Sequence, residues 1–320
     1  MQQRHLGATG LKVSRLGLGT MTWGRDTDEH EAREQLTAFL DAGGTLLDTA
    51  AGYTHGDSER LIGSMLGAVC SRDDVVLATK AGYGSRKGER FRDASRGHLL
   101  RSLDASLERL GVDHVDLFQV HTWVEDTPIE ETMSALDVAV SSGRAAYVGI
   151  SNYSGWQTAQ ATTWQRAVPG RAVPACTQVE YSLLNREIEA ETMPAARALG
   201  LGVLPWSPLG RGVLSGKYRT GTPADSRAAS PHFSSFVGRY LDEDSHRIVE
   251  SVVKAADGLE WTPAEVALAW VRDRPGVTAP ILGARTAAQL REILTVEDCR
   301  LPPEIVEALD DVSRPGGAPG

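Results

Sequence analysis

Residues 75–84 read VVLATKAGYG, a run of apolar and β-branched side chains that leads to an ionisable one, Lys80. A continuous apolar run of this length is typical of a parallel strand that is buried on both faces. TLLD at residues 45–48 and VDLFQVH at residues 115–121 repeat the pattern and end in Asp48 and His121. Successive strands that each end in an ionisable side chain predict a sheet with reactive groups along one edge.

Runs of the same kind recur almost to the end of the chain. The predicted strands are Ser14–Gly19, Thr45–Asp48, Val75–Lys80, Val115–His121, Ala146–Ser151, Cys176–Glu180, Gly202–Ser207 and Ala279–Gly283. Strands that alternate with helical patterns predict parallel pairing through right-handed crossovers. We therefore predict a single (β/α)₈ barrel domain over residues 1–320, since a closed barrel explains eight strands better than an open sheet does.

Amphipathic stretches with a period of 3.6 residues lie between the strands. They predict helices at Asp28–Ala42, Ser95–Leu110, Ser154–Val168, Glu187–Leu199 and Thr286–Leu294, and one that opens at Pro128.

Other segments interrupt this repeat. Arg4–Lys12 is predicted to form a hairpin under the barrel, and Leu241–Asp273 two extra helices, the second starting at Thr262-Pro263. Arg219–Arg239 is predicted to be a long loop that shapes specificity, and Arg314–Gly320 a disordered tail.

Composition narrows the possible functions. The net charge of −9 argues against a nucleic-acid binder, which needs a basic face. No apolar run of about 20 residues predicts a membrane span, and the N-terminus lacks the apolar core of a signal peptide. Cys70, Cys176 and Cys299 form no CxxC pair, which favours reduced thiols in a cytoplasmic protein without a metal site.

Tyr53 follows Asp48 by five residues and is expected above the same edge as Lys80 and His121. These four side chains suit carbonyl reduction, in which hydride addition leaves an alkoxide that needs a proton. A phenol can donate one, and Lys80 is expected to lower the pKa of Tyr53 from its ordinary value of about 10. Asp48 would hold Lys80, and His121 would orient the carbonyl oxygen. Any one of them alone would be read as a cap or a solvated side chain.

Five motifs together resemble the aldo-keto reductase superfamily, including bacterial members and potassium-channel β-subunit-like members. They are DTAxxYxxGxSE at 48–59, ATK at 78–80, GISN at 149–152, QVEYSLLNRE at 178–187 and WSPLGRGVLSGKY at 206–218. The resemblance covers nearly the whole chain. It implies a (β/α)₈ barrel that reduces aldehydes and ketones with NADPH and without a metal. It also implies a catalytic tetrad of Asp48, Tyr53, Lys80 and His121, with Tyr53 as proton donor.

The resemblance also implies the residues that bind the cofactor. They are Thr20, Ser151, Asn152, Gln178, Trp206, Ser207, Leu209, Gly210, Gly212, Lys217, Gly283, Arg285 and Gln289. Ser151, Asn152 and Gln178 would contact the nicotinamide carboxamide, which needs both donors and acceptors. Trp206 would stack on the nicotinamide ring.

The choice of NADPH over NADH depends on Arg285, whose guanidinium can bind a 2′-phosphate through two hydrogen bonds. The family often ends this motif with Glu-Asn, whereas this chain has Glu292-Ile293. The missing amide predicts the loss of one adenine contact and a lower affinity for the cofactor.

Trp23, Trp123 and Tyr181 are expected near the same mouth, as the apolar walls of a pocket for a small carbonyl substrate. Plain packing is the alternative interpretation of each. Arg86, Lys87, Arg90 and Arg92 follow the third strand and could meet an anionic substrate, but a solvated loop is the preferred interpretation.

Two other functions stay open. The chain could reduce keto-deoxysugar nucleotides in a tailoring pathway, as some bacterial members of the superfamily do. It could also be a cofactor-sensing regulatory subunit, like the potassium-channel β subunits, although no partner-docking tail is evident. The oligomeric state cannot be inferred from the sequence.

Overall fold

A computed structural model describes residues 1–86, 89–223, 226–229 and 233–315. Its centre is a closed barrel of eight parallel strands, in which β12 pairs with β3 to complete the circle. The strands are β3 (Gly17–Gly19), β4 (Leu46–Asp48), β5 (Val76–Ala81), β8 (Val115–Val120), β9 (Ala145–Ser151), β10 (Cys176–Glu180), β11 (Gly202–Trp206) and β12 (Ile281–Leu282). The predicted (β/α)₈ barrel is confirmed.

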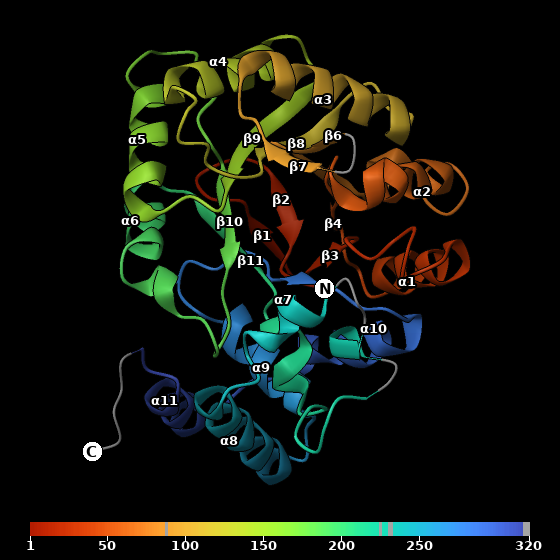
Figure 1. Cartoon of the computed structure of the whole chain (residues 1–320), viewed down its shortest axis with the longest axis vertical. Coiled ribbons are helices and arrows are strands. Elements are labelled where there is room, and N and C mark those ends of the chain that lie inside the picture. The colour runs from red at the N-terminus through yellow and green to blue at the C-terminus, as the bar shows by residue number, and fades with distance from the viewer. Residues whose placement is uncertain (87–88, 224–225, 230–232, 316–320) are drawn as a thin grey trace.

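Helices surround these strands, as Figure 1 shows. They are α1 (Glu29–Asp41), α2 (Asp57–Met65), α3 (Arg96–Leu110), α4 (Ile129–Ser141), α5 (Gly155–Arg166), α6 (Thr192–Ala198), α9 (Pro263–Arg272) and α10 (Ala287–Leu294). Local signals set their ends: the Ser95 side chain caps the start of α3, and Gly111, with φ of 66°, ends it. The sequence prediction missed α2, because its buried face carries the polar Ser58 and Glu59.

The predicted N-terminal hairpin is present as β1 (Gln3–His5) and β2 (Lys12–Ser14), which pair antiparallel. Leu6 and Val13 pack with the starts of the barrel strands, including Leu46 and Leu117. The hairpin therefore closes the end of the barrel where the strands begin. The predicted first strand is split in two, because the chain leaves the hairpin at Ser14 and enters the barrel only at Gly17.

Some helices lie outside the ring that surrounds the barrel. α8 (Glu243–Leu259) and α11 (Pro303–Val312) pack against each other, and Figure 1 shows them side by side. The predicted second extra helix is α9, which starts at Thr262-Pro263 as predicted. A capping box at Thr262 begins it, and the helix leads into β12. The sequence prediction missed α11.

Two predicted loops contain regular structure. The chain after β5 forms a hairpin of β6 (Tyr83–Arg86) and β7 (Glu89–Arg92) in place of the expected loop, and Arg90 and Arg92 are exposed to solvent as expected. Its apolar residues are too sparse to show the alternation of a half-buried strand. The segment 219–239 contains α7 (Ser234–Gly238) and a 3₁₀ turn at Arg227–Ala229.

Short 3₁₀ helices occur elsewhere: η1 (Tyr53–Gly56), η2 (Arg72–Asp74), η3 (Glu187–Glu189), η4 (Gly210–Ser215) and η6 (Thr295–Asp298). Of the tail predicted to be disordered, Arg314 and Pro315 are described and 316–320 lie outside the described residues, as does Lys87. Within the described ranges, no helix combines the length and apolar character needed to span a bilayer.

Candidate active site

A buried ion pair lies where β4 and β5 end. The two strands are neighbours, with Asp48 opposite Ala78, and the Nζ of Lys80 lies 2.6 Å from Oδ1 of Asp48. Nζ also donates to the carbonyl of Thr49 at 2.7 Å. Burial alone would lower the pKa of Lys80, but the adjacent Asp48 carboxylate raises it above its ordinary value. Lys80 is therefore a charged ammonium inside the barrel.

The second oxygen of Asp48 is bound from across the barrel. Gln178 donates to Oδ2 from β10 at 2.8 Å, and Gln119 approaches the same oxygen from β8 at 3.4 Å. The carboxylate thus has a partner on each oxygen. This arrangement fixes Asp48 as the group that holds Lys80.

Tyr53 reaches the pair from the loop above. Its hydroxyl lies 3.5 Å from Nζ of Lys80. Thr54 and His55 have φ of 44° and 57°, and Thr54 is held by a hydrogen bond from Oγ1 to the carbonyl of Trp23 at 2.9 Å. Backbone of this kind is strained and tends to occur at functional sites.

The pKa of Tyr53 is raised rather than lowered. Burial of the phenol raises it, and the nearby Lys80 ammonium offsets only part of that effect. The expected net lowering is wrong for this structure, because the cost of burying a phenolate exceeds the attraction of one cation. Tyr53 therefore keeps its proton at neutral pH.

His121 completes the set. It follows β8, its amide donates to the carbonyl of Ala81 at 2.8 Å, and its ring lies edge-on to Tyr53 with centroids 5.9 Å apart. Tyr83, which was given no role from the sequence, also packs edge-on to His121, with ring centroids 4.8 Å apart. Burial and the Lys80 charge hold the pKa of His121 well below its ordinary value, so the imidazole is neutral at pH 7. Its buried Nδ1 has no hydrogen-bond partner among the described residues.

Helix α2 holds the loop that carries Tyr53. Glu59 is fully buried, accepting from Thr79 of β5 at 2.6 Å and from Nε of Arg109 of α3 at 2.6 Å. Ser58 donates to Thr20, and Thr20 donates to the carbonyl of Asp48 at 3.1 Å. The structure thus places Thr20, a predicted cofactor residue, in a buried network beneath the mouth. The roles of Ser58 and Glu59 were missed, although both lie in the motif at 48–59.

The residues predicted to contact the nicotinamide lie together at the ends of β9, β10 and β11. Asn152 donates from Nδ2 to the carbonyl of His121 at 2.9 Å, and its Oδ1 accepts from the indole of Trp206 at 3.0 Å. Ser151 donates to the carbonyl of Gln178 at 2.8 Å. These hydrogen bonds place the residues that are predicted to hold the carboxamide beside His121 and Asp48 of the tetrad.

The turn after β11 has an unusual backbone. Ser207, Gly210, Arg211 and Gly212 have φ between 52° and 94°, a conformation in which successive amides can converge on an anion. The ammonium of Lys217 lies 3.5 Å from where a Cβ on Gly212 would be. Leu209 packs partly buried against the core. The turn therefore places left-handed backbone beside a cation, while the amides of Gly210 and Gly212 donate to the carbonyls of Ser207 and Leu209.

Arg211, which the sequence analysis assigned no role, anchors this turn. Its guanidinium binds both oxygens of Glu180, at 2.8 and 2.7 Å, and donates to the carbonyl of Phe236 in α7 at 2.6 Å. It also lies 3.8 Å from the centre of the Phe236 ring. The buried arginine thus ties α7 and the turn to the end of β10.

The turn after β12 carries the predicted 2′-phosphate residues. Gln289 accepts from the backbone amide of Arg285 at 3.1 Å, and Gly283 is exposed. The Nε of Arg285 is buried with no partner among the described residues, which fits an anionic group. Ile293 lies partly buried against the core.

The family model for the aldo/keto reductase family matches residues 15–314. The chain belongs to the aldo/keto reductase family. Family membership supports an oxidoreductase, and aldo/keto reductases generally use NAD(P)H.

Three relatives match this aldo/keto reductase over almost their whole length. The uncharacterized oxidoreductase YrpG of Bacillus subtilis (strain 168) is 39% identical, over 99% of this chain and 98% of its own. A probable voltage-gated potassium channel subunit beta of Oryza sativa subsp. japonica is 37% identical. Its counterpart in Arabidopsis thaliana is 35% identical, and both alignments cover 98% of this chain and 96% of the relative.

The three aromatic residues predicted for the substrate pocket differ in position. Trp23 is fully buried and its indole donates to Gln35 at 3.1 Å. Tyr181 is also fully buried and its hydroxyl donates to Glu189 at 2.5 Å. Both are core residues, so the expectation that they form an open pocket wall is corrected.

Trp123 is the partly buried member of the three. It packs edge-on to Tyr153 and to the half-exposed Trp156, with centroids 5.2 and 5.4 Å apart, and its indole donates to Glu125 at 2.7 Å. Its position two residues after His121 leaves it as the candidate wall residue.

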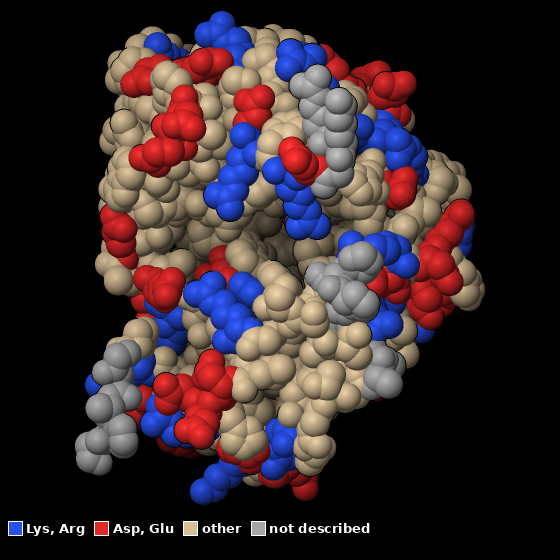
Figure 2. Space-filling model, in the orientation of Figure 1, with Lys and Arg blue, Asp and Glu red and all other residues tan. Residues whose placement is uncertain are grey.

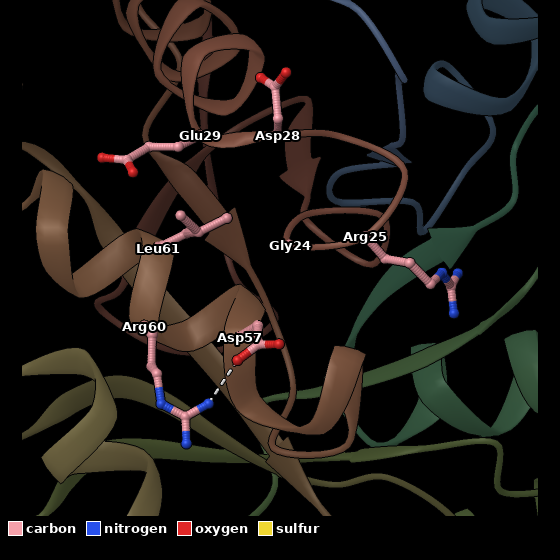
Figure 3. Close-up of a pocket in the computed structure, with 7 residues that line it drawn as sticks. All are labelled: Gly24, Arg25, Asp28, Glu29, Asp57, Arg60 and Leu61. Atoms are coloured by element: carbon pink, nitrogen blue, oxygen red, sulfur yellow. Dashed lines mark hydrogen bonds and ion pairs between the residues drawn. The ribbon is translucent and has the colours of Figure 1, made fainter.

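A separate cavity of about 390 Å³ lies where α1 and α2 begin (Figure 3). Its lining contains no tetrad residue and consists of Gly24, Arg25, Asp28, Glu29, Asp57, Arg60 and Leu61. Arg60 pairs with Asp57 at 2.7 Å, as the figure shows. Its charged side chains are of both signs, so no ligand is indicated there. In the described part of this aldo/keto reductase, no cluster of His, Cys, Asp and Glu is placed to hold a metal ion.

Proposed function

We propose that this aldo/keto reductase reduces an aldehyde or ketone to the alcohol with NADPH, and that Tyr53 donates the proton. The observation that carries the proposal is the buried Lys80 ammonium, which contacts both Asp48 and Tyr53 at the mouth of the barrel. A protonated phenol beside a fixed cation is what proton donation to a developing alkoxide requires.

The proposed reaction divides the work among the four residues. NADPH, when bound, supplies the hydride. Tyr53 transfers its hydroxyl proton to the carbonyl oxygen, and Lys80 stabilises the phenolate that remains. Asp48 keeps Lys80 charged and in place. His121 is neutral, so in the appropriate tautomer it can donate a hydrogen bond to the carbonyl oxygen without competing for the proton.

The choice of NADPH rests on residues that suit each part of the dinucleotide. Ser151, Asn152 and Gln178 would hold the carboxamide beside the tetrad, and Trp206 would lie against the nicotinamide ring. The turn at 207–212 would hold the pyrophosphate. The unpartnered buried Nε of Arg285 supports a 2′-phosphate contact and therefore NADPH rather than NADH.

Tyr53→Phe tests the proposal directly. The variant is expected to lose about 10²–10⁴-fold in kcat/KM for a model aldehyde, because the ring remains but the acidic proton is gone. NADPH affinity, measured by quenching of tryptophan fluorescence, should stay near the wild-type value. Tyr147→Phe is the matched control, since Tyr147 packs with the core near the start of the barrel. Turnover by Tyr53→Phe at the wild-type rate would overturn the assignment.

The two alternative functions can be tested with the same protein. Turnover confined to keto-sugar nucleotides would favour a tailoring reductase. A regulatory subunit is favoured by the two relatives named as probable channel β subunits, and tight NADPH binding without turnover of any carbonyl would support it. We also propose a cytoplasmic location and a small carbonyl compound as the ligand.

A further inference from the structure

The hairpin of β6 and β7 presents two arginines on one face. Its register pairs Tyr83 with Arg92 and Ser85 with Arg90. Residues directly opposite in an antiparallel pair share a face, and side chains alternate along each strand, so these four side chains lie on the same side. Phe91 lies on the other side, 5.5 Å from the ring of His98 in α3. Phe91 thus contacts α3 from one face of the hairpin, and Arg90 and Arg92 lie on the other.

The face with the two arginines borders the active site. The ring of Tyr83 packs edge-on to His121 at 4.8 Å. The Cβ of Tyr83 lies 3.6 Å from where a Cβ on Gly52 would be, directly before the proton donor. The guanidinium of Arg92 lies over the ring of Tyr83, 5.6 Å from its centre. Arg92 and His121 therefore both lie against the same aromatic ring.

Arg90 and Arg92 are exposed cations. Among the residues that the structure describes, no carboxylate forms an ion pair with Arg90 or Arg92, and both are exposed. Two arginines beneath the mouth do form ion pairs: Arg109 pairs with Glu59, and Arg211 pairs with Glu180. Figure 2 shows Lys and Arg side chains at the border of the central hollow, on the side where Figure 1 places β6 and β7. In a protein with a net charge of −9, this local positive field concentrates anions at the mouth.

We propose that Arg90 and Arg92 bind an anionic group, a carboxylate or a phosphate, at the far end of the carbonyl substrate. This inference rests on the proposed reductase function and names the substrate class for it. A guanidinium can hold either oxyanion through two parallel hydrogen bonds, and two guanidiniums on one face give the anion a fixed place. The substrate would then extend from the tetrad past Tyr83 to the hairpin.

The test compares charged and neutral aldehydes of similar size. kcat/KM is measured with NADPH for 4-carboxybenzaldehyde, 4-formylphenyl phosphate and the neutral methyl 4-formylbenzoate. The variant is Arg90→Gln/Arg92→Gln. The control is Arg247→Gln/Lys254→Gln on α8, which removes the same net charge from exposed positions away from the mouth.

The wild-type enzyme is expected to favour an anionic aldehyde over the ester by about tenfold to hundredfold, which is the size of effect that charge-assisted hydrogen bonds give. The preference should come from a lower KM for the anionic aldehyde, and it should weaken with added salt. It should disappear in the hairpin variant but not in the control. The anionic aldehyde with the larger preference identifies the natural group. Equal kcat/KM for charged and neutral aldehydes, or a preference that survives the hairpin substitutions, would overturn the inference and leave the reductase function intact.

A binding measurement separates this failure from failure of the function. Calorimetric titration with 4-(hydroxymethyl)benzoate, an alcohol product, requires no turnover. Suppose that the wild-type protein reduces none of the aldehydes but binds this alcohol, and that the hairpin variant does not bind it. That result would support the anion site and reject the reductase function. Binding that is equal in the wild type and the variant would reject the anion site.

Discussion

The two ends of the barrel both bury charged side chains, but they satisfy them to different degrees. At the end where the strands begin, Arg272 is fully buried and all its nitrogens are occupied: it binds both oxygens of Asp273 and the carbonyls of Val296 and Cys299. Arg15 similarly binds Glu297 through its carboxylate and its carbonyl. The guanidinium of Arg272 thus has every nitrogen engaged within the fold.

At the mouth, the charges are held but incompletely satisfied. Lys80 is fixed by Asp48, whereas its contact with Tyr53 is a long 3.5 Å, and Nδ1 of His121 lacks a partner among the described residues. Buried polar groups are normally saturated, so such exceptions mark positions that a ligand can complete. The comparison teaches that Arg272 and His121 differ in saturation, although Nε of Arg72, before β5, is also buried without a partner among the described residues.

The largest effect is expected from Lys80→Met, which keeps the length of the side chain and removes its charge. Without the ammonium, the phenolate of Tyr53 loses its stabilisation, and kcat/KM should fall about 10³-fold. The measurement is steady-state aldehyde reduction, with circular dichroism to show that the barrel is folded. A variant with near wild-type kcat/KM would show that the mouth and the opposite end are equivalent after all.

Arg272→Met applies the same change at the other end. It leaves the carbonyls of Val296 and Cys299 without their donor and Asp273 without its bidentate partner, so the free energy of unfolding should fall by about 3 kcal/mol. Urea unfolding measures this, and kcat/KM per folded molecule should stay unchanged. A loss of catalysis without a loss of stability would show that Arg272 acts in the reaction rather than in the fold.

The smallest effect is a pH dependence carried by His121. Its pKa is depressed below the ordinary 6.5, so below pH 6.5 the unfolded chain binds a proton that the folded chain does not. The contribution of neutral His121 to the free energy of unfolding is complete above pH 6.5. It is lost as the pH falls toward the lowered pKa of the folded protein, by at most about 1.4 kcal/mol per pH unit. His121→Asn should flatten this acid slope in urea titrations between pH 5 and 7. Identical slopes in the two proteins would place the imidazole outside the buried mouth.

The strands and the tetrad were predictable because one physical rule covers both. Strands buried on both faces show continuous apolar runs, and parallel strands end at the same edge, so Asp48, Lys80 and His121 had to meet. The family motifs placed Tyr53 with them.

Elements whose stability depends on distant partners were not predictable in this way. Helix α2 buries Glu59, which accepts hydrogen bonds from Thr79 and Arg109. These partners are distant in the sequence, so only the folded structure brings them together. The hairpin after β5 has no apolar face of its own, and Tyr83 acquires a role only through its contact with His121. The pKa of Tyr53 also depends on the depth of burial, which the order of residues does not reveal.

The hydrogen bonds of Glu59 have a further consequence for how this barrel can diversify. They attach the loop that carries Tyr53 to β5 and α3 from beneath, so the position of the proton donor rests partly on contacts outside the mouth. Arg90 and Arg92 of the hairpin can therefore be varied while Tyr83, which packs on His121, is kept. A library that randomises them should yield enzymes with new preferences but an unchanged chemical step.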